Sequence, residues 1–298
     1  MGRESAQVGA MSQAVFRFAP SPNGRLHLGH AYSALLNEAL ARDCGGRLLL
    51  RIEDIDPGRT REEHVEAIFA DLGWLGISWE TPVRRQSAHL ADYAEPAGQL
   101  RRRGLLYPCT CSRTEIIREA AAVAARERRE VARDPDGAPL YPGTCRERHP
   151  AQSDASRAPA WRLDMAAARR VVPEPLYWTR FGPDVPDADA VARPESWGDP
   201  VLVRRDTLTS YHLAVVVDDA LQGVTHVVRG RDLEAATDLH RLLQALLGLP
   251  SPHYHHHPLL VDEAGTKLAK SMGSPALADL RLAGDTAASI RSRLGFPA

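Results

Sequence analysis

One stretch, from Arg17 to His30, limits the folds open to this chain. The residues that lead into it, Val15 to Ala19, are apolar-rich and suited to a strand, whereas the Pro- and Gly-rich residues 20–24 exclude regular structure. Apolar residues then return at helical spacing from Leu28 to Arg42. A strand, a turn and a helix N-terminus in this order predict a phosphate site, because N–H groups and the positive end of the helix dipole face the ligand.

A pair of lysines near the other end of the chain is the second informative feature. Lys267 and Lys270 are the only lysines among 298 residues, and arginine supplies the other basic side chains. Lysine carries a compact ammonium on a flexible stem, whereas arginine carries a planar fork. Two lysines within five residues therefore indicate positions that need an ammonium. The alternative is a solvated loop in which they have no role.

These two motifs, HLGH at 27–30 and KLAKS at 267–271, resemble the HIGH and KMSKS elements of class I aminoacyl-tRNA synthetases. Three further stretches resemble the glutamyl branch of that class: RFAPSP at 17–22, RIEDID at 51–56 and VRG at 228–230. The resemblance covers about residues 15–275 and implies an α/β fold, a Rossmann-like parallel sheet split by a zinc-containing insertion. Because only 27 residues follow Ser271, we expect no anticodon-binding domain.

The order of motifs and patterns predicts four segments. They are a tail at 1–14, the first half of a nucleotide-binding catalytic domain at 15–104, an insertion with a zinc site at 105–195, and the second half with the KLAKS loop at 196–298. Thr60 with Glu63, and Ser112 with Glu115, are spaced as capping boxes. Amphipathic and alternating patterns predict helices at 62–72, 87–103, 115–133 and 233–247, and strands at 47–52, 161–163, 176–179, 224–230 and, returning to the sheet, 201–206.

The four cysteines, at 44, 109, 111 and 145, are unevenly spaced. In a chain of this size, clustering of the last three indicates a metal rather than disulfides. Three thiolates are one ligand short of a closed zinc site, and His149 or Tyr141 could supply the fourth. Imidazole is the commoner ligand. The alternative is a metal-free knuckle with reduced thiols. The glutamyl-queuosine tRNA(Asp) synthetases, a branch without an anticodon-binding domain, carry a similar Cys-x-Cys and Tyr-x-x-x-Cys pattern, which implies one structural zinc on Cys109, Cys111, Tyr141 and Cys145.

The same resemblance implies how ATP is held. His27 and His30 would contact its phosphates and ribose, and Gly29, which has no Cβ, would let the nucleotide approach the backbone. Lys270, with Lys267 beside it, would hold the leaving pyrophosphate, and Mg²⁺ would accompany the ATP. These four side chains, His27, His30, Lys267 and Lys270, are the expected catalytic residues.

The second substrate implied by the resemblance is L-glutamate. Its two carboxylates and one ammonium require cations and at least one carboxylate in the pocket. Arg17 would meet the side-chain carboxylate and Glu53 the ammonium, and an amide in place of that carboxylate would leave a buried guanidinium unpaired. His212 stands where the family has asparagine. The rest of the expected pocket consists of Phe18, Ala19, Pro20, Ser21, Tyr211 and Arg229.

Together these features imply an enzyme that forms glutamyl-adenylate and transfers glutamate to queuosine at the wobble position of tRNA(Asp), whose anticodon stem-loop would dock on the catalytic domain. The alternatives are a truncated glutamyl-tRNA synthetase that charges tRNA(Glu) and a non-catalytic synthetase paralogue. A net charge of −1 gives no long-range attraction to RNA, so local arginines such as Arg101–Arg103 would bind it. No apolar run approaches the ~20 residues of a membrane span. We expect a cytoplasmic monomer, with Met11 an alternative start to Met1.

Overall fold

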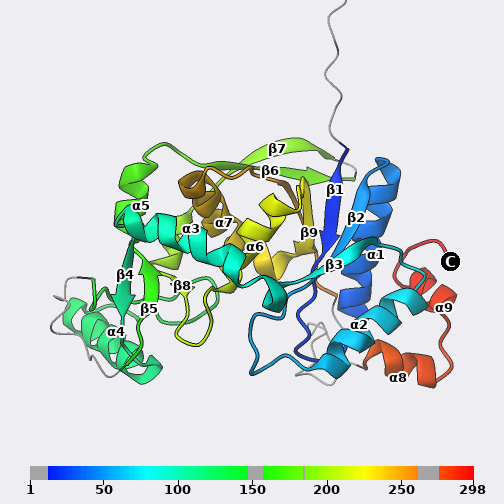
Figure 1. The fold of residues 1–298 in the computed structure, drawn as a ribbon, viewed down its shortest axis with the longest axis horizontal. Helices are drawn as coiled ribbons and strands as arrows, with labels where there is room; N and C mark the ends of the chain where they lie inside the picture. The colour runs from blue at the N-terminus through cyan, green and yellow to red at the C-terminus, as the bar shows by residue number, and fades with distance from the viewer. Residues whose placement is uncertain (1–12, 147–156, 184, 261–274) are drawn as a thin grey trace, which may run out of the picture.

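The structure, a computed structural model, describes residues 13–146, 157–183, 185–260 and 275–298. Its main sheet has seven strands in the order β3-β2-β1-β9-β10-β6-β7 (Figure 1). Neighbouring strands pair in parallel except β6 and β7, which are antiparallel. The α/β fold with a parallel sheet is therefore confirmed. The strands are β1 (Val15–Phe18), β2 (Arg47–Ile52), β3 (Glu80–Arg85), β6 (Tyr177–Gly182), β7 (Val185–Val191), β9 (His226–Gly230) and β10 (His253–His257).

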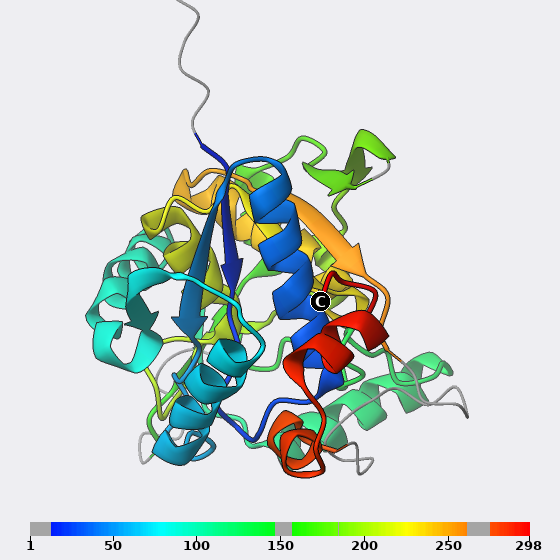
Figure 2. The same cartoon turned by 90° about the vertical axis from the view of Figure 1, so that its right-hand side faces the viewer.

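Helices cover both faces of this sheet, and strand alternation decides which side chains meet them. Phe16, Leu48 and Leu50 share one core with α1 (Leu28–Asp43) and α2 (Glu62–Trp74), and Figure 2 shows α1 lying against that face. On the other face, Val15 and Leu49 share a core with residues from four helices. These are α3 (Ala91–Arg102), α5 (Met165–Val171), α6 (Tyr211–Leu221) and α7 (Glu234–Leu247).

This alternation fixes the direction of two arginines. Arg17 and Arg51 have the same parity as Val15 and Leu49, so their side chains point to the α6 face. Strand β1 lies between β2 and β9, and the chain leaves β1 toward β2 before returning to β9 on its other side. Open α/β sheets bind ligands beyond the carboxyl ends of the strands at such a switch point.

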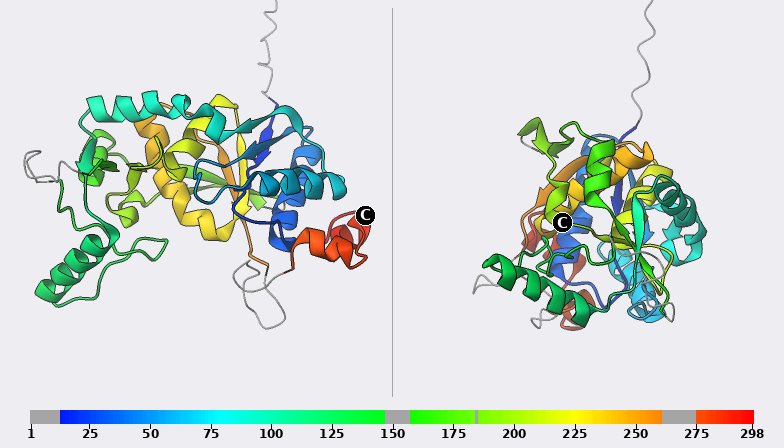
Figure 3. Two further views of the ribbon diagram at one scale, coloured as in Figure 1. Left: turned by 60° about the horizontal axis from the view of Figure 1, so that its bottom comes forward. Right: turned by 90° about the vertical axis from the view of Figure 1, so that its left-hand side faces the viewer.

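A second, three-stranded sheet lies beside the main one, in the order β4-β5-β8. The expected strand at 201–206 is shorter and pairs with β5, so the prediction that it returns to the main sheet was wrong. Instead, β6, from within the segment expected as an insertion, pairs with β10. Figure 3 shows α4 extending from the end that carries the small sheet. The elements are β4 (Leu106–Cys109), α4 (Arg113–Glu127), β5 (Ala160–Leu163), α5 (Met165–Val171) and β8 (Val201–Val203).

The two expected capping boxes have different outcomes. Ser112 and Glu115 form theirs at the start of α4, each side chain bonding the other's backbone N–H. The box of Thr60 and Glu63 was wrong, because α2 has Arg61 at its N-cap and no side-chain cap there. Short 3₁₀ turns complete this part of the fold: η1 (Gln86–His89), η3 (Pro194–Trp197) and η4 (Arg231–Leu233).

The described residues after 274 form two short helices, α8 (Leu277–Leu282) and α9 (Ala287–Arg293). They return to the first motif, because Ala276 forms a bridge with His27 and the Leu277 amide donates to the Leu26 carbonyl at 2.8 Å. Within the described part of the chain, none of the helices has the length and apolar character needed to cross a membrane.

Candidate active site

A cavity of about 700 Å³ opens at the carboxyl ends of β1 and β9. This volume lies within the range of small-molecule sites. Lys267 and Lys270 lie outside the described residues, although Leu260, which precedes that segment, lines the cavity. The structure brings every other residue expected to bind ATP or glutamate to the cavity wall: Arg17, Phe18, Ala19, Pro20, Ser21, His27, Gly29, His30, Glu53, Tyr211 and Arg229.

The two histidines of the first motif are positioned by backbone amides. His27 is the N-cap of α1, and its Nδ1 accepts from the Gly29 amide at 3.1 Å. The Nδ1 of His30 accepts from the His27 amide at 3.2 Å, and the two ring centroids are 3.9 Å apart. A neutral imidazole that accepts at Nδ1 carries its proton on Nε2. Both rings therefore offer an N–H donor of the kind that phosphate oxygens accept.

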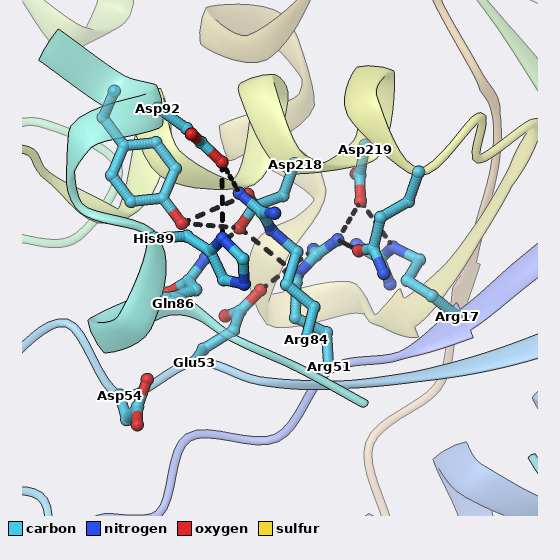
Figure 4. A network of polar contacts seen from close by, with 12 residues as sticks. Arg17, Arg51, Glu53, Asp54, Arg84, Gln86, His89, Asp92, Asp218 and Asp219 are labelled. Carbon is cyan, nitrogen blue, oxygen red and sulfur yellow. Dashed lines mark hydrogen bonds and ion pairs between the residues drawn. The ribbon is translucent and has the colours of Figure 1, made fainter. Parts of the chain in front are cut away.

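Arg17 and Glu53 are joined by Asp219 and Arg51, two residues that were not among those expected to bind substrate (Figure 4). Asp219 Oδ1 accepts from Arg17 Nε at 3.3 Å and from Arg51 Nη1 at 2.7 Å. The other terminal nitrogen of Arg51, Nη2, donates to Glu53 Oε1 at 3.1 Å. The side chain of Arg51 is fully buried. This arrangement holds the two expected substrate-binding charges through one continuous set of ion pairs.

Asp218 anchors the other side of Arg51. It lies 3.8 Å from Arg51 Nε and accepts from Arg84 Nε at 2.7 Å, from Gln86 at 2.8 Å and from the Tyr93 hydroxyl at 3.0 Å. Strand β2, α3 and α6 therefore meet at one buried carboxylate.

These surroundings shift the carboxyl groups in opposite directions. Burial raises the pKa of Glu53 above its ordinary value, although Arg51 and Arg17 oppose the shift. Burial acts in the same sense on Asp219, but there Arg17 and Arg51 outweigh it and lower the pKa. Asp219 is therefore the firmly ionised partner of the two arginines. Glu53 is the carboxylate whose charge a substrate cation would stabilise.

Arg229 is held differently from Arg17. Its Nη1 donates to the Tyr211 hydroxyl at 3.2 Å and contacts His240 Nδ1 at 3.5 Å, and its Nη2 donates to Thr237 Oγ1 at 2.8 Å. Arg229 is 5% exposed, and no carboxylate among the described residues forms an ion pair with it. A buried cation without a counterion is costly, so this position favours an anionic ligand.

The three clustered cysteines form a separate site at the carboxyl end of β4, where Cys109 is the last residue of the strand. The sulfur atoms of Cys109, Cys111 and Cys145 lie within 4.8 Å of one another. The Tyr141 hydroxyl lies 3.5 Å from Cys109 Sγ and 3.6 Å from Cys111 Sγ, and it accepts from the Cys145 amide at 2.7 Å. The alternative ligand, His149, lies outside the described residues. Three thiols and a phenol facing one point fit a tetrahedral metal ion.

Ionisation within this cluster is uneven. Burial raises the pKa of Cys111 to about 12. Burial also pushes the pKa of Cys145 upward, but hydrogen bonds from Tyr141 and from the Thr110 backbone outweigh it and lower the value to about 7. One thiolate is thus available near neutral pH, and a bound cation would favour ionisation of the others.

The expected arginine run at 101–103 is engaged within the fold. The Arg101 guanidinium lies 3.8 Å from the centre of the Trp161 ring, Arg102 pairs with Glu95, and Arg103 donates to the Leu246 carbonyl. Arg101 and Arg103 therefore help to pack α3 against its neighbours, whereas Arg102 pairs within α3, and all three residues are exposed.

A cavity with a pair of histidines at a helix N-terminus, two buried arginines and a carboxylate lies at the switch point of the parallel sheet, where the resemblance to class I aminoacyl-tRNA synthetases places the active site. The chain belongs to this family, because the model of the catalytic domain of class I tRNA synthetases (E and Q) matches residues 13–286. It is a ligase of the aminoacyl-tRNA synthetase type.

Similar sequences identify the branch of the family to which the chain belongs. The chain is 47% identical to the glutamyl-Q tRNA(Asp) synthetase of Rhodobacter capsulatus, over 95% of this chain and 100% of that protein. It is 38% identical to the enzyme of the same name from Symbiobacterium thermophilum, over 94% of this chain and 85% of that one. The chain thus falls in the glutamyl-Q tRNA(Asp) synthetase branch, as the motifs predict.

Solved structures show the same fold. A crystal structure of glutamate-tRNA synthetase from Elizabethkingia anophelis matches with a TM-score of 0.69 and 26% identity. A glutamate tRNA ligase from Elizabethkingia meningosepticum, in complex with its amino acid, matches with a TM-score of 0.68 and 26% identity. In each case the match covers 88% of this chain but 53% of the other, so this chain spans about half the length of those synthetases.

Proposed function

We propose that this enzyme activates L-glutamate with ATP and transfers the glutamyl group to queuosine at the wobble position of tRNA(Asp). One observation carries the first half of the proposal. Two buried arginines and one buried carboxylate line a single cavity beside the histidines of the first motif. These charges complement an amino acid with two carboxylates and one ammonium. Activation joins its α-carboxylate to the α-phosphate of ATP and expels pyrophosphate.

The nucleotide would lie over Gly29, at the N-terminus of α1. His27 and His30 would donate from Nε2 to phosphate oxygens, as their backbone-fixed tautomers allow. Lys270 and Lys267 would hold the pyrophosphate, and Mg²⁺ bound with the ATP would neutralise part of its charge. This assignment is supported by the described residues on the two sides of that segment, since Leu260 lines the cavity and Ala276 pairs with His27. In this scheme catalysis comes from alignment and from cations facing the phosphates.

Glutamate would lie between the two arginines. Its side-chain carboxylate would bind Arg17 and Arg229, and its ammonium would bind Glu53, with Ser21 and Tyr211 completing the pocket. Because the partners of Arg229 among the described residues are neutral, glutamine would leave its charge without a counterion from this part of the chain. Removing one partner of a buried charge pair costs about 2–5 kcal/mol, which corresponds to a preference of roughly 30-fold to several thousand-fold.

The proposed acceptor of the glutamyl group is queuosine of tRNA(Asp). It is supported by relatives whose names specify tRNA(Asp), one of which is matched over its whole length. We propose that the anticodon stem-loop reaches the mouth of the cavity in the cytoplasm and that one monomer suffices. The exposed arginines of the 101–103 run, at the end of α3, would contribute contacts to the phosphates of the stem-loop.

We propose one structural zinc ion on Cys109, Cys111, Cys145 and Tyr141. Four protein ligands would leave no open position for catalysis. Arg205 donates from Nη2 to the Cys111 carbonyl at 2.8 Å, so the cysteine cluster is tied to the loop that leads to Tyr211. The zinc would thereby hold the wall of the active site in place.

The decisive experiment offers labelled glutamate and ATP with tRNA from cells that do or do not make queuosine. We expect label on tRNA(Asp) only when queuosine is present. Label on tRNA(Glu) from both sources would instead identify a truncated glutamyl-tRNA synthetase. Absence of both ATP–pyrophosphate exchange and transfer would identify a non-catalytic paralogue.

A further inference from the structure

The surroundings of Arg229 contain three histidines that the activation chemistry does not use. His240, on α7, is 2% exposed, and His256, on β10, is 9% exposed. His212, on α6, lies with its Nδ1 3.2 Å from His240 Nε2. It stands where the family resemblance implies asparagine. Three imidazoles around one buried cation are unexpected, because each would repel it if protonated.

Hydrogen-bond direction assigns a neutral state to two of these rings. A guanidinium can only donate, so the Arg229 contact at 3.5 Å requires His240 Nδ1 to accept. His240 then carries its proton on Nε2 and donates it to His212 Nδ1. The resulting chain runs from the guanidinium through His240 to His212.

The second amino group of the guanidinium starts a matching chain. Arg229 Nη2 donates to Thr237 Oγ1 at 2.8 Å, and the hydroxyl has its own proton left to donate to His256 Nε2 at 2.9 Å. His256 also lies edge-on to Trp178, with ring centroids 5.4 Å apart. Both chains therefore end in neutral acceptors, and neither supplies a negative charge.

Arg17 and Arg229 differ in the charge of the groups that hold them. Arg17 has a buried carboxylate, Asp219, at 3.3 Å, which offsets its charge in the absence of substrate. Arg229 has a comparably buried guanidinium, and its three partners among the described residues, Tyr211, His240 and Thr237, are all uncharged. The two arginines of one pocket are thus held by opposite means.

We propose that His240 and His212 are positioning residues that orient the Arg229 guanidinium through neutral imidazoles and so keep its charge for the substrate carboxylate. The inference rests on the proposed glutamate activation and adds to it a source of specificity. An acidic residue would orient Arg229 equally well, but it would neutralise the charge that distinguishes glutamate from glutamine.

The rings are protected from protonation over the working pH range. Burial and then the charge of Arg229 lower the pKa of His212 to about 4 and that of His240 well below its usual value. The same two causes, in the same order, lower the pKa of His256 to about 2. The groups that face His240 are Arg229 from β9, Tyr211 and His212 from α6, and His256 from β10, with Arg17 as a further cation.

The test is an isosteric pair of variants, His240→Gln and His240→Glu, assayed by glutamate-dependent pyrophosphate exchange in the full-length enzyme. Glutamine can accept from Arg229 and donate to His212, so we expect its KM for glutamate to stay within about threefold of wild type. Glutamate at this position adds a carboxylate, and KM should rise at least about tenfold, or 1.4 kcal/mol at 25 °C, with kcat changed less. Equal KM values for the two variants would overturn the proposal, because a packing role does not distinguish amide from carboxylate.

A second measurement applies if His240→Glu does not fold, as judged by thermal unfolding. The KM of the wild type for glutamate should show no step between pH 8 and pH 6. A step near pH 6.5, the ordinary value for histidine, that disappears in His240→Gln would overturn the proposal. If the wild type shows glutamate-dependent exchange but the two variants have the same KM, only this inference is wrong. If exchange by the wild type does not depend on glutamate, the proposed function is wrong as well.

Discussion

Replacing Arg51 with methionine should be one of the most damaging single changes outside the cavity wall. The side chain is fully buried and touches three carboxylates: Asp219 at 2.7 Å, Glu53 at 3.1 Å and Asp218 at 3.8 Å. Methionine fills much of the same volume without the charge. Breaking a buried ion pair by removing one partner costs about 3–5 kcal/mol, a large part of the ~5–15 kcal/mol that stabilises a protein.

Thermal unfolding provides the assay, and Arg47→Met provides the matched control. Arg47 lies on the same strand and pairs with Glu80 at 2.6 Å, but both side chains are 42% exposed. An exposed pair contributes about 0–1 kcal/mol. At roughly 2–4 °C per kcal/mol, Arg51→Met should lower Tm by about 6–20 °C and Arg47→Met by less than about 4 °C. A loss no larger in Arg51→Met than in the control would refute the reasoning.

The pH dependence of the Tm difference provides a second, independent test of the role of Arg51. Without Arg51, the pKa values of Glu53 and Asp219 rise in the folded state, since burial is no longer opposed by that cation. A carboxyl whose folded-state pKa is raised binds protons more tightly in the folded than in the unfolded chain, so stability falls as pH rises through its range. The Tm difference between Arg51→Met and wild type should therefore be larger at pH 8 than at pH 5. A difference independent of pH would mean that the lost packing, and not the lost charge, matters.

Three further predictions concern other parts of the chain. Asp71 is 1% exposed, Arg281 lies 3.7 Å away, and neither carboxylate oxygen of Asp71 has a hydrogen-bond partner among the described residues. Because burial raises the pKa of Asp71, Asp71→Asn should raise Tm at pH 8 and lose that advantage toward pH 4. A lower Tm of the variant at pH 8 would contradict this prediction. Purified protein should contain about one zinc per chain, and chelation should lower Tm and make the cysteines accessible to a thiol reagent. Metal-free protein with an unchanged Tm would show that zinc has no structural role. Lys270→Ala should abolish pyrophosphate exchange with Tm unchanged, and retained exchange would exclude that lysine from the mechanism.

Features with local causes could be predicted from the sequence. The helix α1 begins at Leu28, within HLGH, as the apolar spacing predicts, because the Pro- and Gly-rich turn before it excludes an earlier start. The capping box of Ser112 and Glu115 forms because both partners lie within one turn. The clustering of three cysteines likewise follows from their spacing once the fold closes.

Features that depend on distant partners could not be predicted. The strand near 201 reads as apolar and β-branched whichever sheet it joins, and the choice is made by β5, about 40 residues earlier. Arg51 offered a signal, a charge inside the apolar run 48–52, and Asp218 with Asp219 interrupts an equally apolar helix. Each becomes informative only when the other is known, because a charge at such a position is stable only when paired.

The histidines around Arg229 illustrate the same limit. His212 could be recognised as a departure from the family pattern, but its partner His240 lies 28 residues away on another helix. Only the register of α6 against α7 shows that the two rings meet.

ATP–pyrophosphate exchange by the purified wild type, without tRNA, tests the central claim most directly: one cavity joins a glutamate-shaped set of charges to a phosphate-binding helix N-terminus. The assay compares L-glutamate, L-glutamine and L-aspartate. We predict exchange with L-glutamate, and at least about 30-fold less with L-glutamine, since only the carboxylate offsets the charge of Arg229. Equal exchange with glutamate and glutamine, or exchange that needs no amino acid, would contradict it.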